Sequence, residues 1–158
     1  MKLIEEYFPL QEINTIAEYE MAFLKMIPRH IKEKMRELLD PNTQFKGRNL
    51  PKINNLFYYP ARIPASATRA VTLASLLDST VDNDTFLRAI GFENMRRLAK
   101  MSNAIVTLYM VDADRSLVKE IIGSDPKEIT VVDPMAGGGS IPLEALRSVS
   151  YTHLTLPT

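Results

Sequence analysis

The chain has 158 residues and carries 19 Lys and Arg side chains against 19 Asp and Glu side chains, so its formal net charge is zero. Its hydrophobic fraction of 46% and charged fraction of 24% are ordinary for one globular domain. The lack of cysteine excludes disulfides, a thiol nucleophile and a cysteine zinc site, and no apolar run reaches the roughly 20 residues of a membrane helix. We therefore expect a cytoplasmic protein with no membrane-bound part and no metal in this chain.

The first half of the chain predicts helices on either side of a long loop. Apolar residues recur at helical spacing over 10–27, and Pro28 opens a second helix that ends at Asp40. Residues 43–55 are polar and basic and include glycine and proline, which indicates a loop. Small residues then predict a close-packed helix over 65–77. Its expected packing positions are Ala67, Ala70, Val71, Ala74 and Leu77.

Three further helices are expected in the second half of the chain. Asp82 is a candidate N-cap for the first of them, which Gly91 stops. The second covers 92–110, where apolar residues again recur at helical spacing. The third covers 114–122 and has Gly123 as its C-cap. Nearly everything before the next segment is therefore predicted to be helical.

The pattern changes at 127–132, where the last four residues are β-branched and mostly apolar, as expected for a strand that is buried on both faces. A glycine-rich turn follows, and a helix over 140–147 has Pro142 in its first turn, where proline is tolerated. Strand, glycine turn and helix make the first half of a Rossmann-like unit. The predicted fold is mainly α, with a helical region over 1–126 and the start of a Rossmann-like α/β domain over 127–147.

Three kinds of ligand compete for the glycine turn. A P-loop needs a lysine, and none lies between Lys127 and Arg147. The dinucleotide fingerprint needs a third glycine where Pro142 stands. The D-P-x-x-G-x-G turn of S-adenosylmethionine-dependent methyltransferases fits, because its acid suits the cationic groups of the methionine end and its bare backbone allows close approach. A plain turn without a ligand is the remaining alternative. The predicted cofactor-binding residues are Asp133, Pro134, Met135, Ala136, Gly137, Gly138, Gly139 and Ser140.

Three stretches of the chain resemble one family, the adenine-specific DNA methylases whose N-terminal region is a domain of unknown function. "DPMAGGGSIPLEALR" is similar to the family's cofactor motif. "YFPLQEINTIAEYE" over 7–20 resembles its opening segment, and "YYPARIPASATRAVTLASLL" over 58–77 resembles its aromatic-Pro-Ala-Arg-x-Pro segment. The chain departs from the family in lacking tryptophan and in having Ile63 where a second arginine is usual. The resemblance implies methyl transfer from S-adenosyl-L-methionine to the exocyclic amine of a flipped adenine in DNA.

The groups that would bind the adenine are missing from this sequence. The family's Asn/Asp-Pro-Pro-Tyr motif is absent, and so is an acid about 20 residues past the glycines for the ribose hydroxyls. We therefore expect an N-terminal fragment without turnover and assign no catalytic residue to it. Residues 148–158 are rich in Ser and Thr and contain no Lys, Arg, Asp or Glu, so they are interpreted as a non-native tail.

The basic residues are concentrated over 25–69, where ten Lys and Arg stand against three acids and are mixed with aromatic residues. This composition suits DNA or RNA, and a solvated basic face is the alternative. Arg62 and Arg69 are the candidates for nucleic-acid contacts, and pairing with carboxylates of the fold is their other role. Glu144 is either a ligand-side carboxylate or a first-turn acid that complements the helix dipole. An RNA (guanine) methyltransferase fragment and a non-catalytic helical nucleic-acid-binding module remain as alternative functions.

Overall fold

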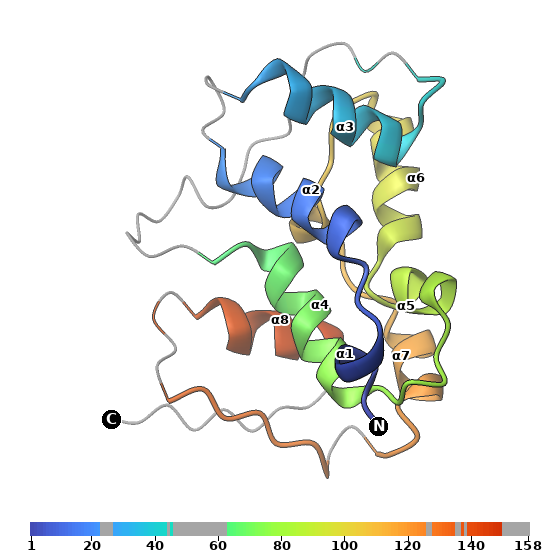
Figure 1. Ribbon diagram of the computed structural model, residues 1–158, viewed down its shortest axis with the longest axis vertical. Coiled ribbons are helices and arrows are strands. Elements are labelled where there is room, and N and C mark those ends of the chain that lie inside the picture. The colour runs from blue at the N-terminus through green and yellow to red at the C-terminus, as the bar shows by residue number, and fades with distance from the viewer. Residues whose placement is uncertain are drawn as a thin grey trace.

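The computed structural model describes residues 1–22, 27–43, 45, 63–125, 128–134, 137 and 139–149. Within these ranges the fold is mainly helical, as the sequence predicts, and no helix is both long and apolar enough to cross a membrane. In chain order the elements are α1 (Leu3–Glu6), α2 (Leu10–Met21), α3 (Arg29–Leu39), α4 (Ala65–Leu76), α5 (Asn83–Ala89), α6 (Phe92–Ser102), the 3₁₀ helix η2 (Leu108–Met110), α7 (Arg115–Ile121) and α8 (Ser140–Ser148) (Figure 1).

Helix α4 is the central element of this arrangement, since it packs against α1, α2, η2 and α8. In Figure 1 the helices α2, α3 and α6 form the upper part of the molecule, and α1, α4, α5, α7 and α8 form the lower part. The most extensive packing between any two described elements is that of α8 on α4. Helix α8, which belongs to the predicted second unit, therefore rests directly on a helix of the predicted first unit.

The first two predicted helices form near their predicted positions. In α3, Ile31, Met35 and Leu39 are buried on one side, and the helix ends at the predicted Asp40. Helix α2 begins at the predicted Leu10 but ends at Met21, and residues 23–26 lie outside the described ranges.

Helix α4 confirms the predicted close packing of small side chains, with one exception. Its residues Ala70 and Ala74, and Leu77 just after it, are fully buried. Ala67 is half-buried and packs against the core. Val71 was expected to pack with them, but it is 46% exposed because it lies on the outer side of the helix.

Local hydrogen bonds explain why two of the shorter helices begin where they do. The Asp82 carboxylate accepts a bond from the Thr85 amide at 3.0 Å, and the Asp114 carboxylate accepts one from the Leu117 amide at 3.1 Å. Both bonds satisfy amides that have no partner within the helix. Gly123 follows α7 at φ +68°, a left-handed conformation that glycine adopts without strain. The predicted N-cap at Asp82 is thus confirmed, whereas the C-cap of α7 is Ile122 and the predicted Gly123 is the left-handed residue that follows it.

The single helix expected over 92–110 is wrong. Helix α6 ends at Ser102, because Asn103 takes a left-handed conformation with φ 49°. Asn tolerates that conformation, and the β-branched residues that follow favour an extended chain. Ile105, Val106 and Leu108 are still buried. Their apolar pattern therefore indicates that these side chains are buried, and not that the helix continues.

The buried strand expected over 129–132 is also not seen among the described residues. Residues 129–133 have no regular secondary structure, Ile129 and Val131 are only half-buried, and Val132 is 63% exposed. A strand that is buried on both faces needs neighbouring strands and covering helices, and no named strand lies within the described ranges. Local β-propensity therefore does not suffice to form a strand here.

Candidate cofactor turn and the buried charges behind it

The glycine turn leads directly into α8. Gly137 has φ +52° and Gly139, the N-cap residue of α8, has φ +74°. Both values lie in the left-handed region, where a side chain would be strained. A Cβ placed on Gly139 would meet no described atom within 4 Å, so glycine is needed there for its conformation and not to make room for the protein. Among the described residues, Gly139 is therefore open on this side.

Five of the eight predicted cofactor-binding residues lie within the described ranges. Asp133 is half-buried, Pro134 and Gly137 are exposed, and Gly139 and Ser140 are half-buried at the start of α8. The three others, Met135, Ala136 and Gly138, lie outside the described residues. The five described residues thus place a carboxylate, bare backbone and a helix N-terminus along one short stretch of chain.

Behind this turn, Arg69 of α4 and Glu144 of α8 form a buried ion pair. Arg69 Nε donates to Glu144 Oε2 at 2.6 Å, and both side chains are 0% exposed. Arg69 Nη1 also donates to the backbone oxygen of Ile90 at 3.0 Å, while Nη2 is buried without a hydrogen-bond partner. The structure therefore gives Arg69 the second of its two predicted roles, pairing with a carboxylate of the fold. Arg62 lies outside the described residues.

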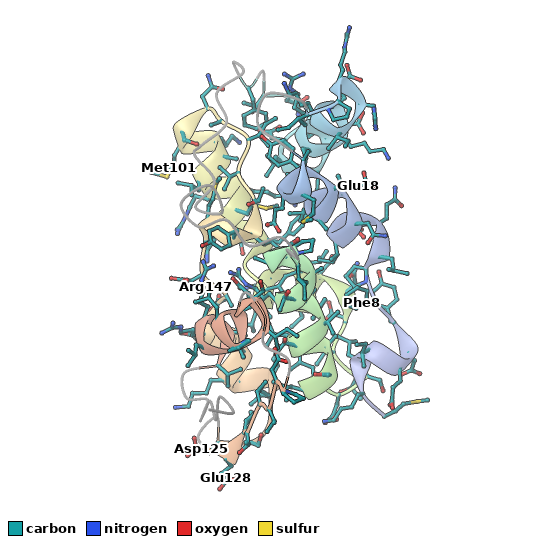
Figure 2. All side chains as sticks on the ribbon, turned by 90° about the vertical axis from the view of Figure 1, so that its left-hand side faces the viewer. Phe8, Glu18, Met101, Asp125, Glu128 and Arg147 are labelled. Carbon is teal, nitrogen blue, oxygen red and sulfur yellow. The ribbon has the colours of Figure 1, made fainter. Side chains whose placement is uncertain are left out.

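Arg147 occupies the second oxygen of the same carboxylate. Its Nη1 donates to Glu144 Oε1 at 2.8 Å, its Nε pairs with Asp112 Oδ1 at 3.0 Å, and its Nη2 donates to the backbone oxygen of Val111 at 2.7 Å. Its guanidinium also lies 5.3 Å from the centre of the Tyr109 ring. Figure 2 labels Arg147 on α8. Arg147 thus ties α8 to the segment before α7.

Two backbone segments approach each other closely beside this cluster. Gly91 has φ +97°, and a Cβ placed on it would lie 2.6 Å from the backbone oxygen of Asp112 and 3.5 Å from Arg69 Nη1. Only glycine satisfies both the conformation and the spacing. Gly91 was predicted to stop a helix, and it also lets the segment that carries Asp112 reach the buried arginine.

A second buried carboxylate lies next to the first cluster. Glu20 of α2 accepts bonds from the Ser66 amide and hydroxyl, each at 3.0 Å, and from the Tyr109 amide at 3.4 Å. Burial raises the pKa of Glu20, and hydrogen bonds from Ser66, Thr107 and Tyr109 oppose that rise.

Burial also lowers the pKa of Arg69, against the attraction of Glu144. Two carboxylates and two arginines therefore form one polar core between α2, α4 and α8.

Sequence reasoning missed this polar core. Glu144 was assigned to the ligand side or to the helix dipole, but its carboxylate is buried against Arg69 and Arg147. One local signal was present, because Glu144 and Arg147 are three residues apart, a spacing that brings side chains together on a helix. The partner on α4 is 75 residues away in the sequence and carries no such signal.

Two grooves beside α3, which belongs to the basic run, are lined by charges of both signs. The groove between α2, α3 and α6 has a volume of about 420 Å³ and is lined by Lys34 and Arg96 but also by Glu12 and Glu37. The neighbouring groove pairs Lys100 with Asp40 at 3.5 Å. These mixed charges are typical of an ordinary solvated surface.

Comparison of the chain with models of protein families, with curated proteins and with solved structures finds no match. Within the described ranges, no group of three or more His, Asp or Glu side chains is placed to hold a metal ion.

Proposed function

We propose that the chain is the N-terminal part of an S-adenosylmethionine-dependent methyltransferase that acts on adenine in DNA. The observation that carries this proposal is the D-P-x-x-G-x-G turn at 133–139, in which Gly137 and Gly139 take positive φ and α8 starts directly afterwards. This order of carboxylate, bare turn and helix suits a ligand that has an ammonium, a sulfonium and a carboxylate at one end.

Each part of the turn meets one of these groups. The Asp133 carboxylate suits the cationic groups of the cofactor. The glycines let the backbone approach the ligand without a Cβ in the way. The Ser140 and Ile141 amides in the first turn of α8, which have no acceptor within the helix, suit the carboxylate of the methionine end. No lysine or arginine lies between Lys127 and Arg147, which agrees with a ligand that brings no phosphate to this turn.

The packing of the chain also supports the proposal. The three stretches that resemble the methylase family contribute α2, α4 and α8, and these helices pack in that order, with α4 between the other two. Residues 129–132 alternate between half-buried and exposed side chains, the period of two that a strand shows. We infer that this segment becomes the first strand of a Rossmann-like sheet in the complete enzyme, where partner strands would bury it.

The proposal is tested on the protein that the complete parent gene encodes. It predicts that the reading frame after Arg147 supplies a second strand ending in Asp or Glu and, further on, an Asn/Asp-Pro-Pro-Tyr motif. Asp133→Ala and Gly137→Val should abolish cofactor binding and methyl transfer while DNA affinity is kept. Gly123→Val is the matched control, because Gly123 also has positive φ but lies in open space after α7.

Three outcomes would contradict the proposal in whole or in part. Unchanged methylation in both turn variants would remove the turn from the cofactor site. DNA binding without any methyl transfer by the intact protein would favour a helical nucleic-acid-binding module. Transfer to RNA in place of DNA would keep the cofactor site and change the substrate to that of an RNA methyltransferase.

A further inference from the structure

We propose that Arg69 and Arg147 are positioning residues that act through Glu144 to fix the first turns of α8 and the glycine turn before it. The inference rests on the proposed function in one respect, namely that the glycine turn is the cofactor site. It assigns Arg69 to the preparation of that site and not to contact with nucleic acid.

Glu144 is well placed to transmit such an effect. It lies four residues after Ser140, the first residue of α8, so its side chain leaves the helix about one turn beyond the glycines. Both of its carboxylate oxygens are held, one by Arg69 at 2.6 Å and the other by Arg147 at 2.8 Å. The bond from Arg69 links α8 to α4, whereas the bond from Arg147 lies within α8 and fixes the Glu144 side chain on the helix. Arg147 in turn links α8 to the segment before α7 through Asp112 and Val111, so the helix is held from two sides.

The two arginines are themselves held by backbone groups outside α8. Arg69 donates to the backbone oxygen of Ile90, and Arg147 donates to that of Val111. Close approach at Gly91 brings these two backbone segments together. The start of α8 is thus held against two backbone segments of the helical region, at Ile90 and at Val111.

The energetics separate positioning from simple stabilisation. A buried ion pair loses solvation, so apolar side chains of similar volume often replace it with little loss of stability. An apolar pair has no directional bonds, however, and would let α8 shift. Replacing both partners by methionine should therefore keep the fold and loosen the turn. If the pair were merely structural, the replacement would either leave both the fold and the turn unchanged or disturb both.

The experiment compares Arg69→Met/Glu144→Met with the wild-type chain and with Arg29→Met/Glu33→Met, which removes an exposed pair on α3. Hydrogen exchange is followed at the Leu143 amide, which donates to the backbone oxygen of Gly139 at 3.0 Å. We expect at least tenfold faster exchange at Leu143 in the first double variant, with exchange in α2 and α3 unchanged. The control pair should leave Leu143 at its wild-type rate.

A folded Arg69→Met/Glu144→Met variant with wild-type exchange at Leu143 would overturn the inference. If that variant does not fold, Glu144→Asp replaces it under the same criterion, because Asp keeps the charge and shortens the reach by one methylene. Titration with S-adenosylmethionine by calorimetry, on the wild-type and variant proteins of the complete parent gene, separates the two proposals. Absence of binding to wild type, with faster exchange in the variant, would refute the cofactor assignment alone. Equal binding to wild type and variant would refute the positioning role alone.

Discussion

Two ion pairs in this protein have nearly the same geometry and very different surroundings. Arg69 and Glu144 approach to 2.6 Å with both side chains 0% exposed, and Arg29 and Glu33 approach to 2.7 Å with side chains 92% and 47% exposed. Water screens the second pair, whereas the first must satisfy its charges within the protein. Burial, not distance, therefore decides which pair constrains the fold.

The largest expected effect comes from removing one member of the buried pair. Glu144→Gln leaves the Arg69 charge buried without a compensating carboxylate, which should lower the free energy of unfolding by about 3–5 kcal/mol. Glu33→Gln on α3 is the matched control and should cost less than about 0.5 kcal/mol. Denaturation with urea measures both, and similar losses in the two variants would break the comparison.

A second test addresses the close backbone approach beside the buried pair. Gly91→Ala combines a left-handed φ with a Cβ 2.6 Å from the Asp112 backbone oxygen. We expect a loss of about 1–2 kcal/mol from the conformation and about 1–3 kcal/mol more from the clash. Gly123→Ala has positive φ but open space, so thermal or urea unfolding should show only the first part. An equal loss in both variants would mean that the approach at Gly91 is not constraining.

Glu20 extends the comparison to pH. Because burial raises its pKa in the folded chain, the folded state holds the Glu20 proton more tightly, and the contribution of Glu20 to stability falls as pH rises from the unfolded value of 4.5 to the folded pKa. Glu20→Gln removes this titration, so the stability of the variant relative to wild type should increase with pH over that window, by at most about 1.4 kcal/mol per pH unit, and stay constant above it. Urea denaturation at several pH values would contradict this if the difference stayed constant within that window.

The smallest expected effect concerns a carboxylate outside the polar core. Asp114 caps α7 through its bond to the Leu117 amide. Asp114→Ala should cost about 1 kcal/mol, and Asp114→Asn, which keeps a capping oxygen, should cost much less. Calorimetric unfolding distinguishes the two variants. A cost for Asp114→Ala as large as that for Glu144→Gln would mean that burial is not the deciding property.

Features that depend on neighbouring residues were predictable from the sequence. The cap at Asp82 and the buried small side chains of α4 were expected, because each follows from residues within a few positions along the chain. The end of α6 was not expected, because Ile105 and Val106 continue the apolar pattern after Asn103 has already turned the chain. Apolar spacing predicts which side chains are buried more reliably than it predicts where a helix ends.

Features that depend on distant partners could not be predicted in this way. Residues 129–132 have the composition of a buried strand, but a strand forms only with neighbours. Arg69 and Glu144 are 75 residues apart, and each had two reasonable roles when considered alone. The glycine turn was recognised from its own residues, whereas the charges that hold the following helix became visible only in the packed chain.

A double-mutant cycle between Arg69 and Glu144 tests the central claim most directly. The free energy of unfolding is measured for wild type, Arg69→Met, Glu144→Met and the double variant. We predict that the double variant is more stable than Glu144→Met, which leaves the Arg69 charge buried without a carboxylate, and that its loss is smaller than the sum of the two single losses. Additive losses would contradict the account, since they would mean that the two side chains do not act as a pair.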